Sequence, residues 1–139
     1  MQFDKSKADR ALKFFRNLAH TKGQWRGVPF TLLQWQEQML RDVFGSLRED
    51  GTRQYTTVYL EIGKKMGKSE IGAGIGLYCL TSDDEFAAEV YGCAADRQQA
   101  SIVFDVAVDM VDQNKALKKH IRPILSQKRL IYLPTKSFY

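Results

Sequence analysis

A run of small and basic residues carries the clearest chemistry in this sequence. It lies between a stretch with strand composition and a stretch with helix composition. The run consists of Gly63, Lys64, Lys65, Met66, Gly67, Lys68 and Ser69. Backbone N–H groups in such a loop bind phosphate, and the dipole of the following helix favours the anion. Lys68 is placed to reach the β- and γ-phosphates of ATP, and the Ser69 hydroxyl is placed to bind Mg²⁺.

The spacing of this run departs from the standard phosphate-binding loop. The standard pattern has a glycine five residues before Gly67, but Ile62 stands there and Gly63 leaves the loop one residue short. A basic surface turn is the alternative interpretation, because a Gly-Lys-Ser run also arises by chance. The order of strand, loop and helix favours phosphate binding. Gly67 is then required, since a side chain there would stand between the backbone and the phosphate.

Two glutamines lie upstream, in the segment PFTLLQWQ at 29–36. A glutamine amide offers a donor and an acceptor together, which suits the edge of adenine. Thr31 and Gln34 have the spacing of a capping box, so we expect Gln34 to cap a helix that begins at Leu32. Gln36 is therefore the candidate for adenine, with an exposed helix glutamine as the alternative.

A third segment, YGCAADRQQA at 91–100, has the pattern of a strand, a turn and a capped helix. In a parallel sheet, the loop that follows a strand faces the ligand crevice. Arg97 and Gln98 are therefore candidates for contact with the nucleotide or with nucleic acid. A solvated helix start is the equally weighted alternative.

The elements predicted around these motifs alternate between helix and strand. We expect helices at 4–20, 32–44 and 68–80, a helix capped by Asp96, a short helix at 115–126, and strands at 55–62, 88–94 and 129–133. This order predicts an α/β fold of the P-loop NTPase type, with a largely parallel sheet flanked by helices. We assign the glycines at 72, 74 and 76 to tight helix–sheet packing. We expect 1–139 to be the N-terminal portion of one domain, with a helical lead-in at 1–50, the start of the α/β core at 51–139, and a truncated sheet.

Composition restricts the class of protein further. The chain has 139 residues, a net charge of +5 and 44% hydrophobic residues, which are ordinary globular values with a preference for an anionic partner. Cys79 and Cys93 lie far from both histidines, which argues against a zinc site or a disulfide framework. The sequence has neither a signal-peptide pattern nor an apolar run of membrane-spanning length. We expect a soluble intracellular protein.

Taken together, these motifs resemble the large terminase subunit of tailed bacteriophages. PFTLLQWQ resembles the adenine motif of that family, KKMGKSE its variant Walker A loop, and YGCAADRQQASIVFD the segment after its next strand. The resemblance implies an ATPase domain that uses ATP and Mg²⁺ to package double-stranded DNA, joined in the intact protein to a C-terminal endonuclease domain. It also implies a homo-oligomeric ring that works with the small terminase subunit and the portal in the host cytoplasm.

Two departures qualify what the resemblance implies. The family commonly has an arginine early in its loop, whereas Lys64 stands at that position and Lys65 at the next. Lys64 is the candidate for sensing the γ-phosphate, but lysine lacks the bidentate fork of arginine. The sequence also has no hydrophobic strand that ends in Asp-Glu after the loop, and we predict Asp83-Asp84-Glu85 to be a turn.

We therefore expect the catalytic carboxylates and the nuclease to lie outside these 139 residues, and nucleotide binding without turnover. The alternatives to a packaging motor are a helicase-like nucleic-acid-dependent ATPase and a non-enzymatic basic nucleic-acid-binding module.

Overall fold

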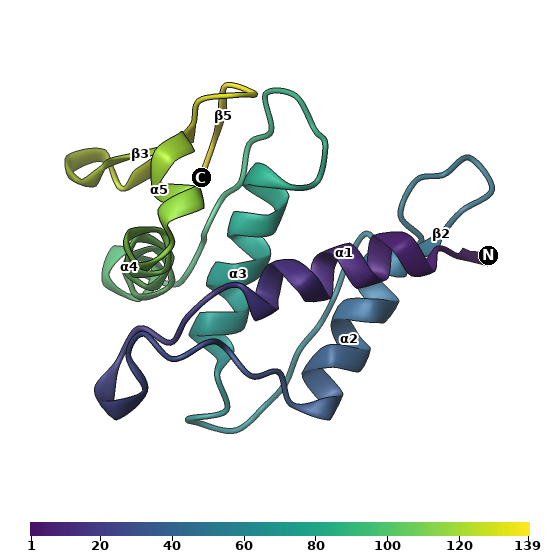
Figure 1. Cartoon of the computed structure of the whole chain (residues 1–139), viewed down its shortest axis with the longest axis horizontal. Helices are drawn as coiled ribbons and strands as arrows, with labels where there is room; N and C mark the ends of the chain where they lie inside the picture. The colour runs from purple at the N-terminus through teal and green to yellow at the C-terminus, as the bar shows by residue number, and fades with distance from the viewer.

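The computed structural model describes residues 1–139. Its four longest helices (Figure 1) are α1 (Lys5–Arg16), α2 (Gln34–Gly45), α3 (Lys68–Thr81) and α4 (Arg97–Gln113). The smaller elements are β1 (Gln2–Phe3), η1 (Gly23–Trp25), β2 (Ser46–Leu47), α5 (Lys115–His120), β3 (Ile121–Ile124), η2 (Leu125–Gln127), β4 (Arg129–Tyr132) and β5 (Ser137–Phe138).

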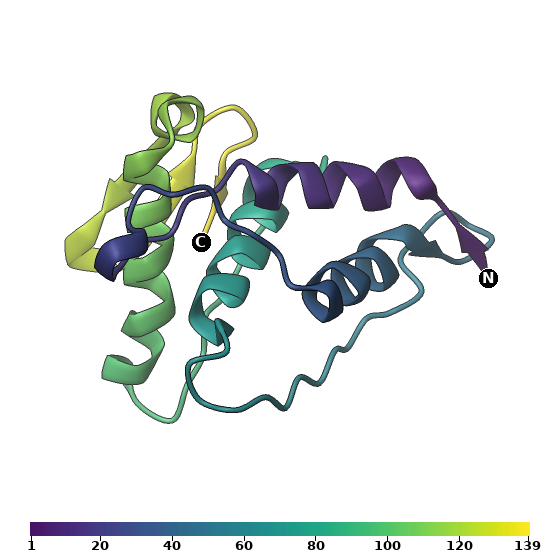
Figure 2. The ribbon, with the colours of Figure 1, turned by 60° about the horizontal axis from the view of Figure 1, so that its bottom comes forward.

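The core lies between two helix pairs. α1 packs along α2, and α3 packs along α4, as Figure 2 shows from the side. Phe15 of α1, Leu77 of α3 and Met110 of α4 are almost completely buried within one apolar cluster. Burial of a large apolar side chain contributes about 1.5–3 kcal/mol, so this cluster fixes the direction in which α3 points.

Two of the predicted helix starts are confirmed by their caps. The Asp4 carboxylate accepts a hydrogen bond from the Lys7 N–H at 3.0 Å, and the Asp96 carboxylate accepts one from the Gln99 N–H at 2.9 Å. Such caps satisfy N–H groups that the first turn leaves without partners. α1 ends at Arg16, before the predicted position 20, and Ala19 then pairs with Pro29 in an isolated antiparallel bridge.

The predicted start of α2 is wrong in its details. The helix begins at Gln34 rather than at Leu32, and its N-cap is Leu33. The side-chain Oε1 of Gln36, and not that of Gln34, accepts a hydrogen bond from the Leu33 N–H at 2.9 Å. Leucine has no polar side-chain atom, so only this half of a capping box exists. Thr31 and Gln34 therefore do not form the box that their spacing indicates.

The predicted strand at 55–62 is extended but pairs with no other segment. Of the backbone N–H and C=O groups from Tyr55 to Ile62, none forms a hydrogen bond to another backbone group. Figure 2 shows this stretch running from β2 to α3 along the outside of the molecule. Its apolar residues are partly solvated, with Tyr59 85% exposed. A segment of high strand propensity becomes a strand only when a neighbour supplies the ladder.

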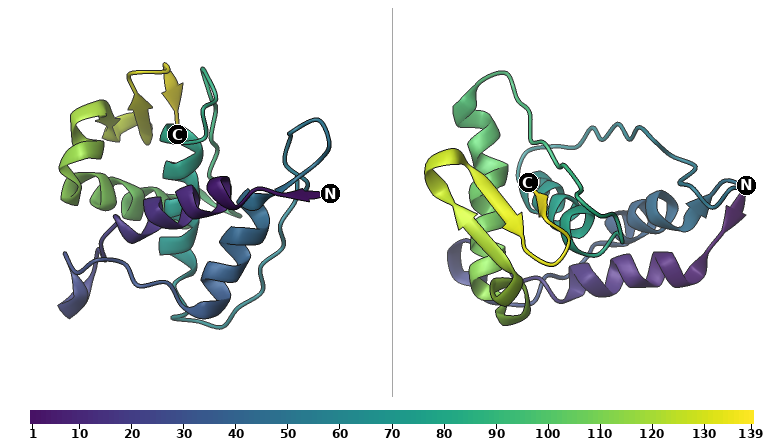
Figure 3. Two further views of the ribbon diagram at one scale, coloured as in Figure 1. Left: turned by 45° about the vertical axis from the view of Figure 1, so that its right-hand side comes forward. Right: turned by 90° about the horizontal axis from the view of Figure 1, so that it is seen from above.

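The largely parallel sheet is likewise not present within residues 1–139. The two sheets are small and antiparallel: β1 pairs with β2, and β3, β4 and β5 form a three-stranded sheet beside α4 and α5 (Figure 3). The predicted strand at 88–94 makes one isolated parallel bridge, from Glu89 to Phe138. The mixed helix and strand content is as expected.

The predicted helix at 115–126 is confirmed in its first half and wrong in its second half. α5 ends at His120, and the chain turns into β3, where Pro123 pairs with Leu130 of β4. Proline has no N–H to donate, and it is tolerated here because β3 lies at the edge of its sheet. The predicted strand at 129–133 is confirmed as β4.

The helix–sheet packing that we predicted for the glycines of α3 is confirmed only at Gly76, because Tyr139 is hydrogen-bonded to Leu130 of β4. A Cβ on Gly74 would lie 2.8 Å from Cζ of Phe15 in α1, and a Cβ on Gly76 would lie 3.0 Å from Cε1 of Tyr139. A Cβ on Gly72 would lie 3.5 Å from Val103, which is ordinary contact. The close approach at Gly74 is therefore between two helices and does not involve a sheet.

Asp83 and Asp84 lie in the turn after α3, as predicted. Asp83 pairs with Arg53, and Asp84 pairs with Arg10 of α1, with its Oδ1 2.9 Å from Nη2. α3 has 14 residues, so this turn lies roughly 20 Å from the Lys68 end of the helix. Neither carboxylate is near the candidate phosphate loop.

The pair between Arg10 and Asp84 predicts a pH-dependent contribution to stability. The hydrogen bond from Arg10 lowers the pKa of Asp84 from its ordinary value of 3.8. A carboxyl whose pKa is lowered by folding contributes stability above its unfolded pKa, and this contribution is lost as the pH falls through the folded value. Since both side chains are largely exposed, Asp84→Asn should cost less than about 1 kcal/mol at neutral pH.

Urea unfolding measured by circular dichroism at neutral pH and at about pH 2.5 tests this pair. The difference in unfolding free energy between the unchanged chain and Asp84→Asn should shrink at the lower pH. A difference of the same size at both values would contradict the assignment.

None of the helices is long and apolar enough to span a membrane.

Candidate functional site

The turn before α3 has a left-handed backbone at its glycine, which the sequence analysis did not predict. Gly67 is the N-cap of α3, with φ +81° and ψ 20°, in the left-handed region. Its carbonyl accepts the Ile71 N–H at 2.9 Å, which starts the helix directly after it. A residue with a Cβ costs about 1–2 kcal/mol in this region, so glycine is favoured here for a backbone reason. Lys65 also has positive φ, at 63°, so the loop contains two left-handed bends.

Lys68 folds back over this loop. Its Nζ donates a hydrogen bond to the Ile62 carbonyl at 3.1 Å, although the side chain is predominantly exposed to solvent. An ammonium group has three donors, so this contact leaves two for an anion. The side chain of Lys68 thus lies on the same face as the loop and the first turn of α3.

Gln36 joins α2 to the loop. It is 3% exposed, its oxygen accepts the Leu33 N–H, and its Nε2 lies 3.5 Å from the Met66 carbonyl. A Cβ on Gly67 would lie 3.4 Å from the same Nε2. The amide that we predicted for adenine therefore contacts the loop backbone, and it takes no part in lining the cavity described next. Its adenine role stays a prediction.

A cavity of about 990 Å³ opens beside the loop. One wall is formed by the loop and the start of α3, and the other by the segment 20–25, with Val106 of α4 between them. The lining residues are His20, Thr21, Lys22, Gly23, Trp25, Lys64, Lys65, Gly67, Lys68, Ser69, Glu70 and Val106. Pockets of about 300–1,000 Å³ hold small ligands and cofactors, so this volume suits a nucleotide.

The charges around the cavity favour an anion. Four lysines line it, Lys22, Lys64, Lys65 and Lys68, together with the N-terminal end of the 14-residue α3. The partial positive charge at a helix N-terminus adds to theirs. Glu70 is the one carboxylate in the lining, and its Oε2 lies 3.4 Å from Nδ1 of His20.

The predicted residues of the loop are thus mostly brought together, with two exceptions. Lys64, Lys65, Gly67, Lys68 and Ser69 all line the cavity, whereas Gly63 and Met66 do not. The residues fit a nucleotide phosphate, since several lysines and the N-terminus of α3 line one cavity. For Mg²⁺, the Ser69 hydroxyl is present, and the one carboxylate in the lining is Glu70, which lies against His20.

The sequence did not indicate the opposite wall of the cavity. The segment 20–29 lacks periodicity, so the sequence indicates only a loop there. The one feature of the sequence that could indicate a binding site there is the combination of a histidine, a lysine, a glycine and a tryptophan within six residues. Such a combination becomes informative only when the fold places it against the phosphate loop.

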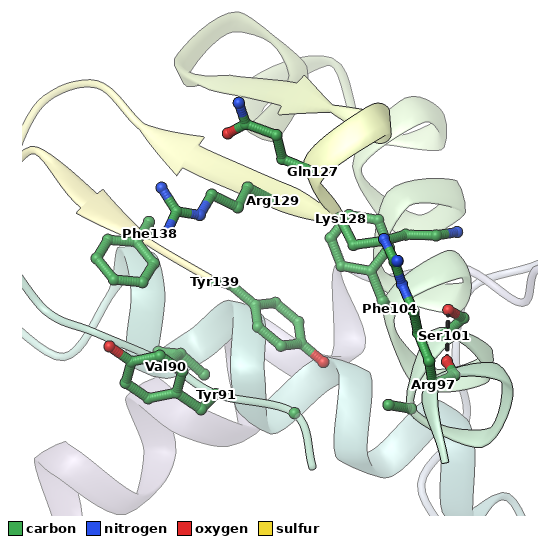
Figure 4. A pocket seen from close by; sticks show the side chains of 12 residues that line it. Val90, Tyr91, Arg97, Ser101, Phe104, Gln127, Lys128, Arg129, Phe138 and Tyr139 are labelled. Carbon is green, nitrogen blue, oxygen red and sulfur yellow. Dashed lines mark hydrogen bonds between the residues drawn. The ribbon is translucent and has the colours of Figure 1, made fainter. Parts of the chain in front are cut away.

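Arg97 lines a different pocket, of about 260 Å³, between α4 and the β4–β5 strands. Figure 4 shows Arg97, Lys128 and Arg129 around the rings of Phe104, Phe138 and Tyr139. The Arg129 guanidinium lies 5.0 Å from the centre of the Phe138 ring. Gln98 does not contribute to this pocket or to the larger cavity. The suggested contact of Arg97 with the nucleotide stays a prediction, since Arg97 lies outside the cavity at the loop.

Over residues 34–135, the chain matches the family described as "Terminase large subunit, ATPase domain". This match covers most of the chain, so the chain belongs to the ATPase-domain family of large terminase subunits. The family agrees with the order of extended segment, glycine-lysine loop and helix around Lys68.

The large terminase of phage HK97 extends this comparison, both in sequence and in structure. The "Terminase, large subunit" of Enterobacteria phage HK97 is 29% identical over 136 residues, which is 96% of this chain and 26% of that protein. The crystal structure of the HK97 bacteriophage large terminase matches with a TM-score of 0.78 and 28% identity, covering 100% of this chain and 27% of that chain. The chain therefore spans about a quarter of the length of these relatives and corresponds to their N-terminal ATPase region.

Proposed function

We propose that this chain is the nucleotide-binding front part of an ATP-driven motor that packages phage DNA into procapsids. The observation that carries the proposal is the left-handed Gly67 turn and the Lys68 ammonium, which face one cavity in a chain of the terminase family. In the intact protein, we infer double-stranded DNA as the substrate of translocation. The small subunit and the portal are the inferred partners, and a homo-oligomeric ring in the host cytoplasm is the inferred assembly.

The residues of the loop have different roles in binding ATP. The N–H groups of the loop backbone and of the first turn of α3 donate hydrogen bonds to the phosphates, Lys68 neutralises the β- and γ-phosphates, and Lys64 contacts the γ-phosphate. Lys65 adds positive charge at the mouth of the cavity. Ser69 donates its hydroxyl oxygen to Mg²⁺, which when bound neutralises charge that develops on the phosphates.

Hydrolysis needs a carboxylate to orient the attacking water, and the cavity lining has only Glu70, which is paired with His20. We therefore propose that residues 1–139 bind nucleotide without turning it over. The carboxylates and the endonuclease would come from other parts of a protein of the relatives' length. The unpaired segment 55–62 would join a parallel sheet of the P-loop type when such a protein supplies the neighbouring strand.

Binding of Mg²⁺–ATP to the chain and its variants, measured by isothermal titration calorimetry, tests the proposal. Lys68→Ala removes charge-assisted hydrogen bonds worth about 1.5–3 kcal/mol, so the affinity should fall roughly 10- to 150-fold. Lys119→Ala is the matched control, because Lys119 is an exposed lysine of α5 outside the cavity. Its affinity for ATP should equal that of the unchanged chain.

Two results would count against the proposal. One is failure of the unchanged chain to bind ATP, and the other is an affinity of Lys68→Ala for ATP equal to that of Lys119→Ala. Either result would favour a basic nucleic-acid-binding module in which the Gly-Lys-Ser run is accidental. The match to the terminase family already favours a packaging motor over the helicase-like ATPase.

A further inference from the structure

The positive charge of the chain is concentrated in one segment. Residues 113–139 contain seven lysines and arginines and no aspartate or glutamate. The other 14 cations and all 16 carboxylates lie in residues 1–112, which therefore have a net charge of −2. The segment 113–139 forms α5 and the antiparallel sheet of β3, β4 and β5. The net charge of +5 thus comes entirely from the part of the molecule that contains this sheet.

The strand register places two arginines side by side on one face of the sheet. Arg122 of β3 lies opposite Ile131 of β4, and Arg129 of β4 lies opposite Ile124 of β3. Opposite residues of an antiparallel pair point to the same face, as do residues two positions apart in one strand. Arg122 and Arg129 are therefore diagonal neighbours, with Cβ atoms within roughly 8 Å, and both are exposed. Leu130 points to the other face, where it is completely buried in the apolar core.

No carboxylate neutralises these two arginines. Neither Arg122 nor Arg129 takes part in an ion pair of the chain. The Arg129 guanidinium lies over the Phe138 ring, and Figure 4 shows the two side chains together. The ring holds the guanidinium in place without removing its charge. Neighbouring like charges in a sheet repel each other, so an anion that bridges the two arginines would relieve this repulsion.

The positive surface continues into the pocket of about 260 Å³ between α4 and the β4–β5 strands. Arg97, Lys128 and Arg129 line this pocket, and its lining contains no carboxylate. We name Arg97, Arg122, Lys128 and Arg129 the basic face. None of the four lines the cavity at the phosphate loop. The chain therefore has two separate surfaces that favour anions, one at the N-terminus of α3 and one on the β3–β4–β5 sheet.

A group of cations without carboxylates suits a polyanion. Duplex DNA carries one negative charge per about 1.7 Å of its axis, so several side chains of one face contact phosphates at once. Single-stranded sites instead need open aromatic rings on which bases stack. Phe104 and Tyr139 of the pocket are buried. Tyr91 is exposed, but it donates a hydrogen bond at 2.7 Å to the Glu89 carboxylate, which repels phosphate. The chemistry of this surface therefore favours a duplex backbone.

We propose that the basic face contacts the phosphate backbone of duplex DNA without reading its sequence, on a surface separate from the ATP cavity. Backbone contacts position a protein on DNA and carry no sequence information directly, which suits a motor that moves along any sequence. This inference rests on the proposed packaging function and specifies which surface of the chain contacts the DNA.

Fluorescence anisotropy of a labelled duplex of mixed sequence, titrated with the chain at several KCl concentrations, tests the basic face. The slope of log K against log salt reports the number of phosphate contacts, with about 0.9 for each. Arg122→Gln combined with Arg129→Gln should therefore reduce the slope by about 1.8 and weaken binding to unrelated sequences equally. Arg122→Gln alone changes an exposed side chain outside any ion pair, so it should reduce the slope by about 0.9 with an unchanged circular dichroism spectrum.

Lys7→Gln combined with Lys13→Gln is the matched control, because it removes the same charge from exposed positions of α1. This control should keep the slope of the unchanged chain. Equal slopes in the arginine variant and the lysine control would overturn the basic face, since net charge alone would then explain the binding. Tighter binding of the corresponding single strand than of the duplex, at the same salt, would overturn the contact with a duplex backbone.

The affinity of Lys68→Ala for Mg²⁺–ATP tests the ATP site independently of DNA. If that affinity falls while the arginine variant binds DNA like the lysine control, only the basic face is overturned. If Lys68→Ala binds ATP as tightly as the unchanged chain, the proposed function itself fails, whatever slope the arginine variants show.

Discussion

Phe15→Ala is expected to destabilise the chain by about 3–5 kcal/mol, the range measured for removing a buried aromatic side chain. Phe15 is 0% exposed and lies in the central apolar cluster, where α1 crosses α3. Its removal would leave a cavity between helices that also position the phosphate loop. Stabilities of native domains are about 5–15 kcal/mol, so this one change would remove a large share of the total.

Urea unfolding followed by circular dichroism measures this loss. Phe86→Ala is the matched control, because Phe86 is 68% exposed in the loop after α3. Its unfolding free energy should lie within about 0.5 kcal/mol of that of the unchanged chain. Equal effects of the two substitutions would mean that the packing of α1 on α3 is wrong.

Gly74→Ala is expected to destabilise the chain by as much as about 3 kcal/mol, although alanine is the better helix former. The added Cβ would lie 2.8 Å from Cζ of the fully buried Phe15 ring, so the two helices would have to move apart. Gly72→Ala is the control on the same helix, because its Cβ would make only ordinary contact with Val103. That variant should gain up to about 1 kcal/mol from helix propensity.

A double variant separates packing from backbone effects. In the Phe15→Ala background, Gly74→Ala should cost little or even stabilise, because the ring that the Cβ would meet is gone. Thermal and urea unfolding of the four chains give the interaction energy between the two positions. Additive effects would show that Phe15 does not limit the residue at 74.

Some residues of the candidate site could be predicted from the sequence, and others could not. The Gly67, Lys68 and Ser69 run was recognisable because its chemistry and its helix are local, within seven residues. The contacts of Gln36 were not recognisable from the sequence. Which of the two glutamines caps α2 depends on where the helix begins, and α2 begins two residues later than predicted. The second contact of Gln36 is with Met66, which belongs to another segment. Trp25 and Thr21 lie in a segment without periodicity, so only the fold places them in the cavity lining.

The amino-acid sequence by itself determined the features that depend on neighbouring residues: the carboxylate caps at Asp4 and Asp96, the glycine turn at Gly67, the helical periodicity of α4, and the turn at Asp83 and Asp84. Tertiary structure alone decided which extended segments became strands. The segment 55–62 has every local property of a strand, but a ladder needs a second chain segment at hydrogen-bonding distance, and none within these residues lies there. The wall at 20–25 was decided in the same way, because a binding cavity is made by surfaces that meet only after α1, α3 and α4 have packed.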